Sequence, residues 1–104
     1  MKTAIVKLSL LSTAQGGRSL PIVHLRDFSC PVFFKNIPEL AEHGYDCRIL
    51  VKQYGREIHP GDIVQEIQIA FLSPDDVFSH IKKGVKFDLW ESRKIGEGEV
   101  VAIV

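Results

Sequence analysis

Apolar and polar residues alternate along most of this chain, and this alternation constrains its fold more than any other feature. The pattern runs through residues 3–10, 45–54, 63–71 and 85–90. A period of two residues is that of a β-strand with one face against a core and the other toward water. Each alternating stretch is short and is followed by turn-forming residues. The sequence therefore predicts an all-β protein built from short antiparallel strands.

The two central strands show the alternation most clearly. The residues that we expect to face the core are Cys47, Ile49 and Val51 in the first strand, and Ile63, Ile67, Ile69 and Phe71 in the second. Gln65 interrupts the second set. Between the strands, Pro60 and Gly61 suit the central positions of a type II turn, because glycine takes the required positive φ without strain.

Glycine and proline mark the connections elsewhere. Residues 13–21 read "TAQGGRSLP" and should form a long hairpin connection, since Gly16 and Gly17 break the alternation. A short strand is expected at residues 32–34. The polar residues 35–44 then predict a loop that contains at most one helical turn.

One short helix is predicted, near residues 74–83. Ser73 can cap its N-terminus, and Pro74 suits the first helical position. Two lysines and a glycine, residues 82–84, suit its end. The apolar residues along one side of this helix would cover an open end of the sheet: Val77, Phe78 and Ile81.

The chain closes on "GVKFDLWESRKIGEGEVVAIV", in which a charged turn separates two apolar strands. Val85, Phe87 and Leu89 share one face of the first of these strands. Gly96 and Gly98 share one face of the second. Because glycine inside a strand usually marks a bulge or a close backbone approach, we expect these two to serve the closure of the sheet.

About six short strands with almost no helix imply a barrel or a sandwich. A composition of 45% hydrophobic and 25% charged residues is that of an ordinary globular protein. We expect residues 1–104 to form a single β-barrel domain. No apolar run approaches the length of a membrane span, so no membrane contact is predicted.

Charge and cysteine content narrow the functional classes. Thirteen Lys and Arg balance thirteen Asp and Glu, so any attraction for phosphate must come from a local patch, and DNA binding is not expected. Cys30 and Cys47 are expected to be reduced thiols in a cytoplasmic protein, because the N-terminal residues resemble a strand more than a signal peptide.

Four landmarks in order resemble the C-terminal β-barrel domain of elongation factor Tu and related translational GTPases. They are "LLSTAQGGRSLPI", "PVFF", "HPGDIVQEIQIAF" and the closing hairpin. The resemblance covers nearly the whole chain and implies a closed six-stranded antiparallel Greek-key barrel. It also implies that no GTPase domain is present. No segment matches the G-x-x-x-x-G-K-[ST] loop, so neither GTP nor another cofactor is expected.

The resemblance also implies a candidate binding site at the closing turn. In the family this corner contributes contacts to aminoacyl-tRNA through the pattern Arg-Glu-Gly-Gly-Arg. This chain has Trp90, Glu91, Ser92, Arg93 and Lys94 instead, and its turn is one residue shorter. Only Glu91 and the basic pair carry over, and side chains fill the space that Gly-Gly leaves open. A solvated charged turn is the simpler interpretation.

Two further side chains are candidates for partner contacts. Arg18, after Gly16 and Gly17, can fork onto a carboxylate or a phosphate, although a flexible turn with a solvated arginine is the simpler interpretation. Trp90 lies opposite the core-facing parity of its strand. It is either partly exposed as an interface anchor or packed under the predicted helix.

Histidine and cysteine give little support to catalysis or metal binding. The four histidines and two cysteines lack the Cys-x-x-Cys or His-x-x-x-His spacing of zinc sites, so no metal is expected. A nucleophilic pair of Cys30 with His24 is a remote alternative, since such partners meet in space rather than in sequence. A core or loop cysteine is the simpler interpretation.

The sequence therefore predicts a non-enzymatic binding module with a protein partner. The candidate contact residues are Arg18, Trp90, Glu91, Ser92, Arg93 and Lys94. The alternative is RNA binding, as to tRNA in translation. A positive stripe that joins Arg18, Arg93 and Lys94 to residues 82–83 would favour RNA, and an apolar patch around Trp90 would favour protein. No oligomeric state is predicted.

Overall fold

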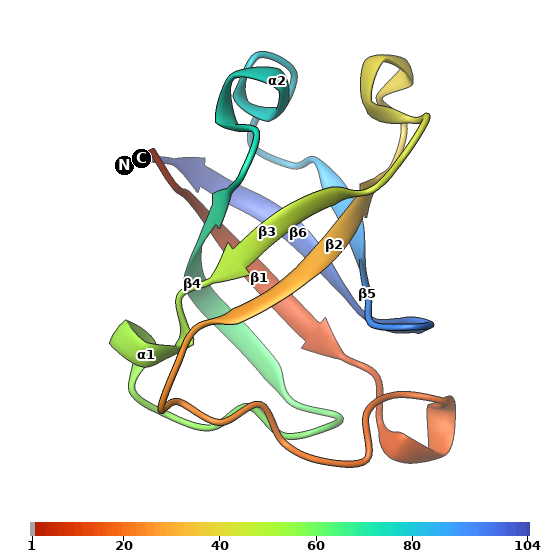
Figure 1. Cartoon of the computed structure of the whole chain (residues 1–104), viewed down its shortest axis with the longest axis vertical. Coiled ribbons are helices and arrows are strands. Elements are labelled where there is room, and N and C mark those ends of the chain that lie inside the picture. Colours follow the sequence, from red (N-terminus) through yellow and green to blue (C-terminus); the bar gives the residue numbers. More distant parts are fainter. Residues whose placement is uncertain (1) are drawn as a thin grey trace.

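Every strand of this protein pairs with a neighbour on each side, so that the sheet closes on itself. The structure is a computed structural model that describes residues 2–104. It forms one antiparallel barrel in the order β1-β4-β3-β2-β5-β6 (Figure 1). The strands are β1 (Ala4–Leu10), β2 (Phe28–Phe34), β3 (Tyr45–Ile49), β4 (Ile63–Phe71), β5 (Lys86–Trp90) and β6 (Lys94–Ile103). The expected all-β fold with six strands is confirmed.

The connection after β1 crosses the barrel end rather than forming a hairpin. β1 pairs with β4 on one side and with β6 on the other, and β2 pairs with β3 and β5. The expectation of a hairpin at residues 13–21 was therefore wrong, because closure of the barrel occupies both edges of β1. Three consecutive strands, β2 to β4, with β1 returning beside β4, make the Greek-key arrangement.

The barrel interior is filled by the inward-facing side chain of every second residue. Val6, Val32, Ile49, Ile69 and Phe87 are all fully buried, one from each of five strands. The alternation predicted for β1 and for β5 is confirmed by their burial. These side chains form one continuous core, which leaves only the outer face and the two rims of the barrel for contacts.

The closing hairpin depends on close packing at two glycines, as expected. A Cβ atom on Gly98 would lie 2.2 Å from the ring of Phe87, which is the cross-strand partner of Gly98 and is fully buried. A Cβ on Gly96 would lie 2.9 Å from the carbonyl oxygen of Ser9 in β1. Both glycines therefore allow β6 to approach its neighbours closely.

A β-bulge in β4 overturns part of the predicted core. Val6 pairs with Ile67 but Leu8 pairs with Val64, so one extra residue of β4 lies between the two pairs. The extra residue reverses the alternation. Ile63, which we expected in the core, is therefore 59% exposed, and Val64 is 4% exposed in its place.

The helices are shorter and more numerous than predicted. The expected helix near residues 74–83 is α2, which ends early and spans Pro74–Phe78. Ser73 makes no capping hydrogen bond, and the chain leaves the helix so that Ile81 can enter the core. An unpredicted helix, α1 (Val51–Tyr54), replaces the end of the strand expected at residues 45–54. β3 ends at Ile49 because the chain turns at the barrel rim.

The connections contain two further helical turns, η1 (Thr13–Gln15) and η2 (Pro38–Leu40). The second is the helical turn expected in the loop 35–44. The turn at Pro60 and Gly61 is also confirmed, since Gly61 has a φ of 88° and the Asp62 amide donates to the His59 carbonyl. In the part of the chain that the structure describes, no helix is long and apolar enough to cross a membrane.

Candidate functional site

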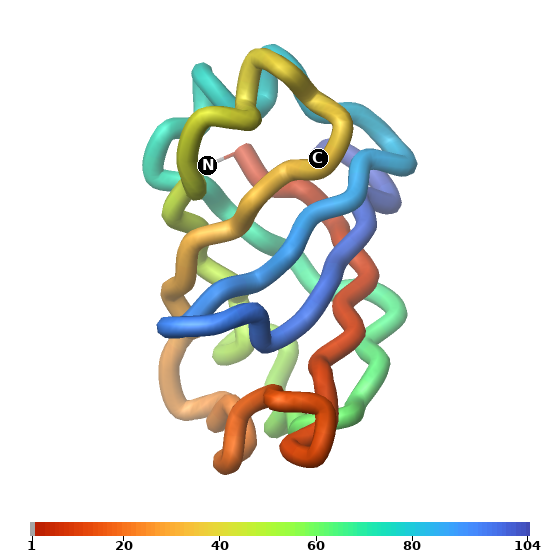
Figure 2. Tube along the Cα trace, turned by 90° about the vertical axis from the view of Figure 1, so that its right-hand side faces the viewer, coloured from red at the N-terminus to blue at the C-terminus, as the bar shows by residue number. Residues whose placement is uncertain are grey.

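The two candidate corners predicted from the sequence lie side by side. The guanidinium of Arg18, in the β1–β2 connection, forms an ion pair and hydrogen bond with the Glu91 carboxylate in the β5–β6 turn. Figure 2 shows that turn directly above the lower connections of the barrel. Arg18, Trp90 and the turn residues thus belong to one surface rather than to two.

Arg18 is held by three groups at once. Besides Glu91, its Nε donates to the Leu20 carbonyl at 3.1 Å, and its guanidinium lies 5.0 Å from the centre of the Phe28 ring. The side chain is only 18% exposed. Because Nε and one terminal nitrogen of the guanidinium donate to partners within the chain, Arg18 joins the two segments and is only partly free to bind a phosphate.

Arg93 also connects the same two segments. Its guanidinium donates to the Gly17 carbonyl at 3.1 Å. Gly17 itself is packed tightly, since a Cβ there would lie 2.3 Å from the Leu11 carbonyl oxygen. In the turn, Ser92 has a φ of 66°, a conformation that glycine adopts more easily. The corner is thus built from close backbone contacts.

The last residue of the predicted site, Lys94, belongs to a network of charges on β5 and β6. Its ammonium lies 2.6 Å from the Glu97 carboxylate and 3.4 Å from Asp88, which Lys35 also approaches at 3.2 Å. The hydrogen bond with Glu97 raises the pKa of Lys94, and the same bond lowers the pKa of Glu97. Its positive charge is therefore largely compensated by neighbouring carboxylates on the outer face of the barrel.

An aromatic pair lies on the outer face of the barrel. The rings of Trp90 on β5 and Phe33 on β2 meet edge to face, with 5.5 Å between their centres. They are 37% and 39% exposed, and the Phe33 ring also lies on the backbone of Gly44. Trp90 is thus the partly exposed residue of our first interpretation. The alternative, in which Trp90 packs under the helix, was wrong, since its ring packs against Phe33 on β2 and is partly exposed.

We call Trp90, Phe33, Arg18 and Glu91 together the Trp90 face. Val23 lies next to the ion pair in a small depression that Arg18 and Glu91 also line. The same connection exposes further apolar side chains, namely Leu20 and Leu25. An apolar centre beside paired charges of both signs is therefore the chemistry of this surface.

The two lysines that would complete the positive stripe do not join this surface. Lys82 and Lys83 precede β5, whereas the β5–β6 turn follows it, so the two groups lie at opposite ends of that strand. They line a separate cleft of about 570 Å³ at the other rim, where four lysines face one glutamate: Lys35, Lys82, Lys83, Lys86 and Glu39. The continuous positive stripe that would favour RNA at the Trp90 face is not formed.

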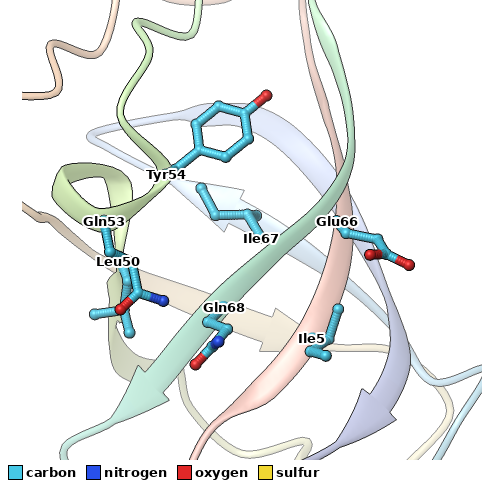
Figure 3. A pocket seen from close by; sticks show the side chains of 7 residues that line it. All are labelled: Ile5, Leu50, Gln53, Tyr54, Glu66, Ile67 and Gln68. Atoms are coloured by element: carbon cyan, nitrogen blue, oxygen red, sulfur yellow. The ribbon is translucent and has the colours of Figure 1, made fainter.

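A smaller pocket lies between α1, β1 and β4 (Figure 3). Its volume is about 190 Å³, and it is lined by Ile5, Leu50, Gln53, Tyr54, Glu66, Ile67 and Gln68. The Gln68 amide oxygen accepts a hydrogen bond from the Thr3 hydroxyl and is thus partly satisfied. Its volume lies below the usual range of ligand sites.

The cysteines face each other rather than a histidine. Cys30 on β2 and Cys47 on β3 are directly opposite in the strand register, and both are buried. The pKa of the Cys47 thiol is raised, first by its hydrogen bond with the Cys30 thiol and then by burial. No contact supports a pair of Cys30 with His24. Among residues 2–104, no group of three or more metal-binding side chains gathers.

Sequence reasoning missed one residue of this surface, Phe33. Its strand was predicted, but its contact with Trp90 depends on the pairing of β2 with β5. Its position between two inward-facing residues, Val32 and Phe34, was the available signal for an outward side chain. No protein family and no curated protein matches this chain. Its functional class must therefore come from its own residues.

Proposed function

We propose that this chain is a non-enzymatic binding module that holds a protein partner on the Trp90 face. The observation that carries the proposal is the exposed Trp90–Phe33 pair beside the Arg18–Glu91 ion pair. Aromatic side chains, tryptophan above all, often dominate the energy of protein interfaces, and such anchors are typically surrounded by polar groups.

The charge around the aromatic pair favours protein over nucleic acid at this face. Arg18 is paired with Glu91, and Lys94 with Glu97. A polyanion would have to displace these carboxylates or lie beside them, which costs affinity. A protein surface that offers an apolar pocket and a mixed polar rim meets no such repulsion. The partner class is therefore protein.

The proposal includes a relationship to the translational GTPases. A closed six-stranded Greek-key barrel is what resemblance to the C-terminal domain of elongation factor Tu implies. The close-packed glycines of the closing hairpin are consistent with that resemblance. We infer a role beside translation and a cytoplasmic location, the latter from two free buried cysteines.

Affinity capture with matched variants tests the proposal. Bait chains would be the unchanged protein, Trp90→Ala, Phe33→Ala and the control Leu72→Ala, which removes an exposed apolar side chain outside the Trp90 face. The expected result is a protein whose recovery falls at least tenfold with both aromatic variants and is unchanged in the control. Equal recovery by all four baits would refute the proposal.

RNA binding is the second candidate, and the lysine cleft is the observation that favours it. Lys82, Lys83 and Lys86 make no ion pair within residues 2–104, so their charges are available to phosphate. A Lys82→Glu/Lys83→Glu variant should lose affinity for a labelled RNA, and binding should weaken steeply as salt rises. Binding that ignores both changes would exclude this cleft.

A further inference from the structure

We propose that Cys30 and Cys47 form a modification site, at which oxidation joins β2 to β3 through a reversible cross-strand disulfide. The two residues are register partners in the antiparallel pair. Opposite residues in such a pair have Cα atoms about 4.5 Å or 5.5 Å apart, depending on the pair type. Both separations fall within the range of about 4.4–6.8 Å that a disulfide requires.

The side chains also point the same way. Cys30 lies between outward-facing Ser29 and half-buried Pro31, and Cys47 between outward-facing Asp46 and Arg48. Both thiols therefore enter the barrel interior, where Cys30 is 5% and Cys47 is 1% exposed. Because the two residues are register partners and both side chains point inward, the disulfide can form without moving the strands far.

The chemistry needs a two-electron oxidant, and a low-molecular-weight disulfide such as glutathione disulfide supplies it. The Cys30 thiolate attacks one sulfur of that disulfide and releases one small thiol, leaving a mixed disulfide. The Cys47 thiolate then attacks the Cys30 sulfur and releases the second small thiol. The two cysteine sulfurs are oxidised, the small disulfide is reduced, and its two products take up the two protons.

The order of attack follows from exposure. Cys30 is the more accessible of the two thiols, and the raised pKa of Cys47 makes its thiol the poorer first nucleophile. Both thiols become accessible when β2 separates locally from β3. Pro31, opposite Asp46, lacks an amide hydrogen and so removes one possible ladder donor beside Cys30. Oxidation should therefore be slow. Reduction of the finished disulfide should be slow for the same reason.

The test compares reduced and oxidised protein. The unchanged chain is incubated with glutathione disulfide in mild denaturant, returned to buffer and analysed by intact mass and thermal unfolding. The expected product has lost two hydrogen atoms, carries no adduct and regains them with dithiothreitol after unfolding. Its thermal midpoint should be about 10 °C above that of the reduced chain, since the bond restricts the unfolded state.

Matched variants separate this site from general thiol reactivity. Cys30→Ala and Cys47→Ala should each take up one glutathione and never lose two hydrogen atoms. The double variant should have the same midpoint with and without oxidant. The proposal is overturned if the unchanged chain stays reduced, ends with two adducts or a dimer, or closes the bond without a rise in midpoint. None of these outcomes depends on the protein partner.

Discussion

Arg18 and Glu91, which are 73 positions apart in the chain, form an ion pair that joins the β1–β2 connection to the β5–β6 turn. Arg93 adds a second link between the same segments through the Gly17 carbonyl. The corner beside Trp90 is thus fixed by two arginines that come from opposite segments. A fixed corner loses little conformational entropy when a partner binds, which suits an interface.

The Arg18–Glu91 pair should make a measurable but small contribution to stability. We expect a double-mutant cycle with Arg18→Ala and Glu91→Ala to give a coupling of about 0.5 kcal/mol, because Glu91 is partly exposed to water. The coupling should shrink in about 1 M salt. Urea unfolding of the four chains measures it, with Arg48→Ala, an exposed arginine, as the control. A coupling of zero at low salt would contradict this prediction, because the lost hydration of the two charges would then cancel their attraction.

Gly98 should not tolerate a side chain. A Cβ at this position would lie 2.2 Å from the buried ring of Phe87, so Gly98→Ala forces the ring or β6 to move. Overpacking of this kind costs about 2 kcal/mol. Unfolding in urea should show the loss, and Phe87→Leu should restore part of it when combined with Gly98→Ala. If the double variant loses the sum of the two single stability losses, the Phe87 ring does not clash with a side chain at position 98.

The bulge in β4 gives a direct comparison of neighbouring residues. Val64→Ala removes buried methyl groups and should destabilise the barrel by about 2 kcal/mol. Ile63→Thr changes an exposed side chain and should stay within about 0.5 kcal/mol of the unchanged protein. Urea unfolding of the two variants tests the bulged register. Under strict alternation, Ile63→Thr would be the more destabilising change.

The same two residues illustrate what the sequence can predict. Alternation identified the strands because it depends on neighbours along the chain, and it placed Val6 and Phe87 correctly in the core. It failed at Ile63 because the bulge arises from pairing with β1. It also missed α1, since Val51 is buried whether its segment is strand or helix.

The candidate site was also predicted only in part from the sequence. Arg18, Trp90 and the closing turn were each identified from local composition or from the family resemblance. Their meeting was not, because the Arg18–Glu91 pair and the Trp90–Phe33 contact join distant segments. Two predicted cations at this corner, Arg18 and Lys94, turned out to be paired with carboxylates, which is consistent with the protein partner that the sequence already favoured over RNA.

The Lys94–Glu97 pair should make stability depend on pH at both extremes. Glu97 has a lowered pKa, so its contribution is present above the ordinary value of 4.5 and is lost as pH falls through the lowered value. Lys94 has a raised pKa, so its contribution is present below 10.5 and is lost as pH rises through the raised value. Because the pair is exposed, Glu97→Gln should cost only about 0.5 kcal/mol at neutral pH and nothing at either extreme. Unfolding free energies measured across pH check this, with Glu99→Gln on the same strand as the control. A cost for Glu97→Gln that is equal at all pH values would contradict the assignment.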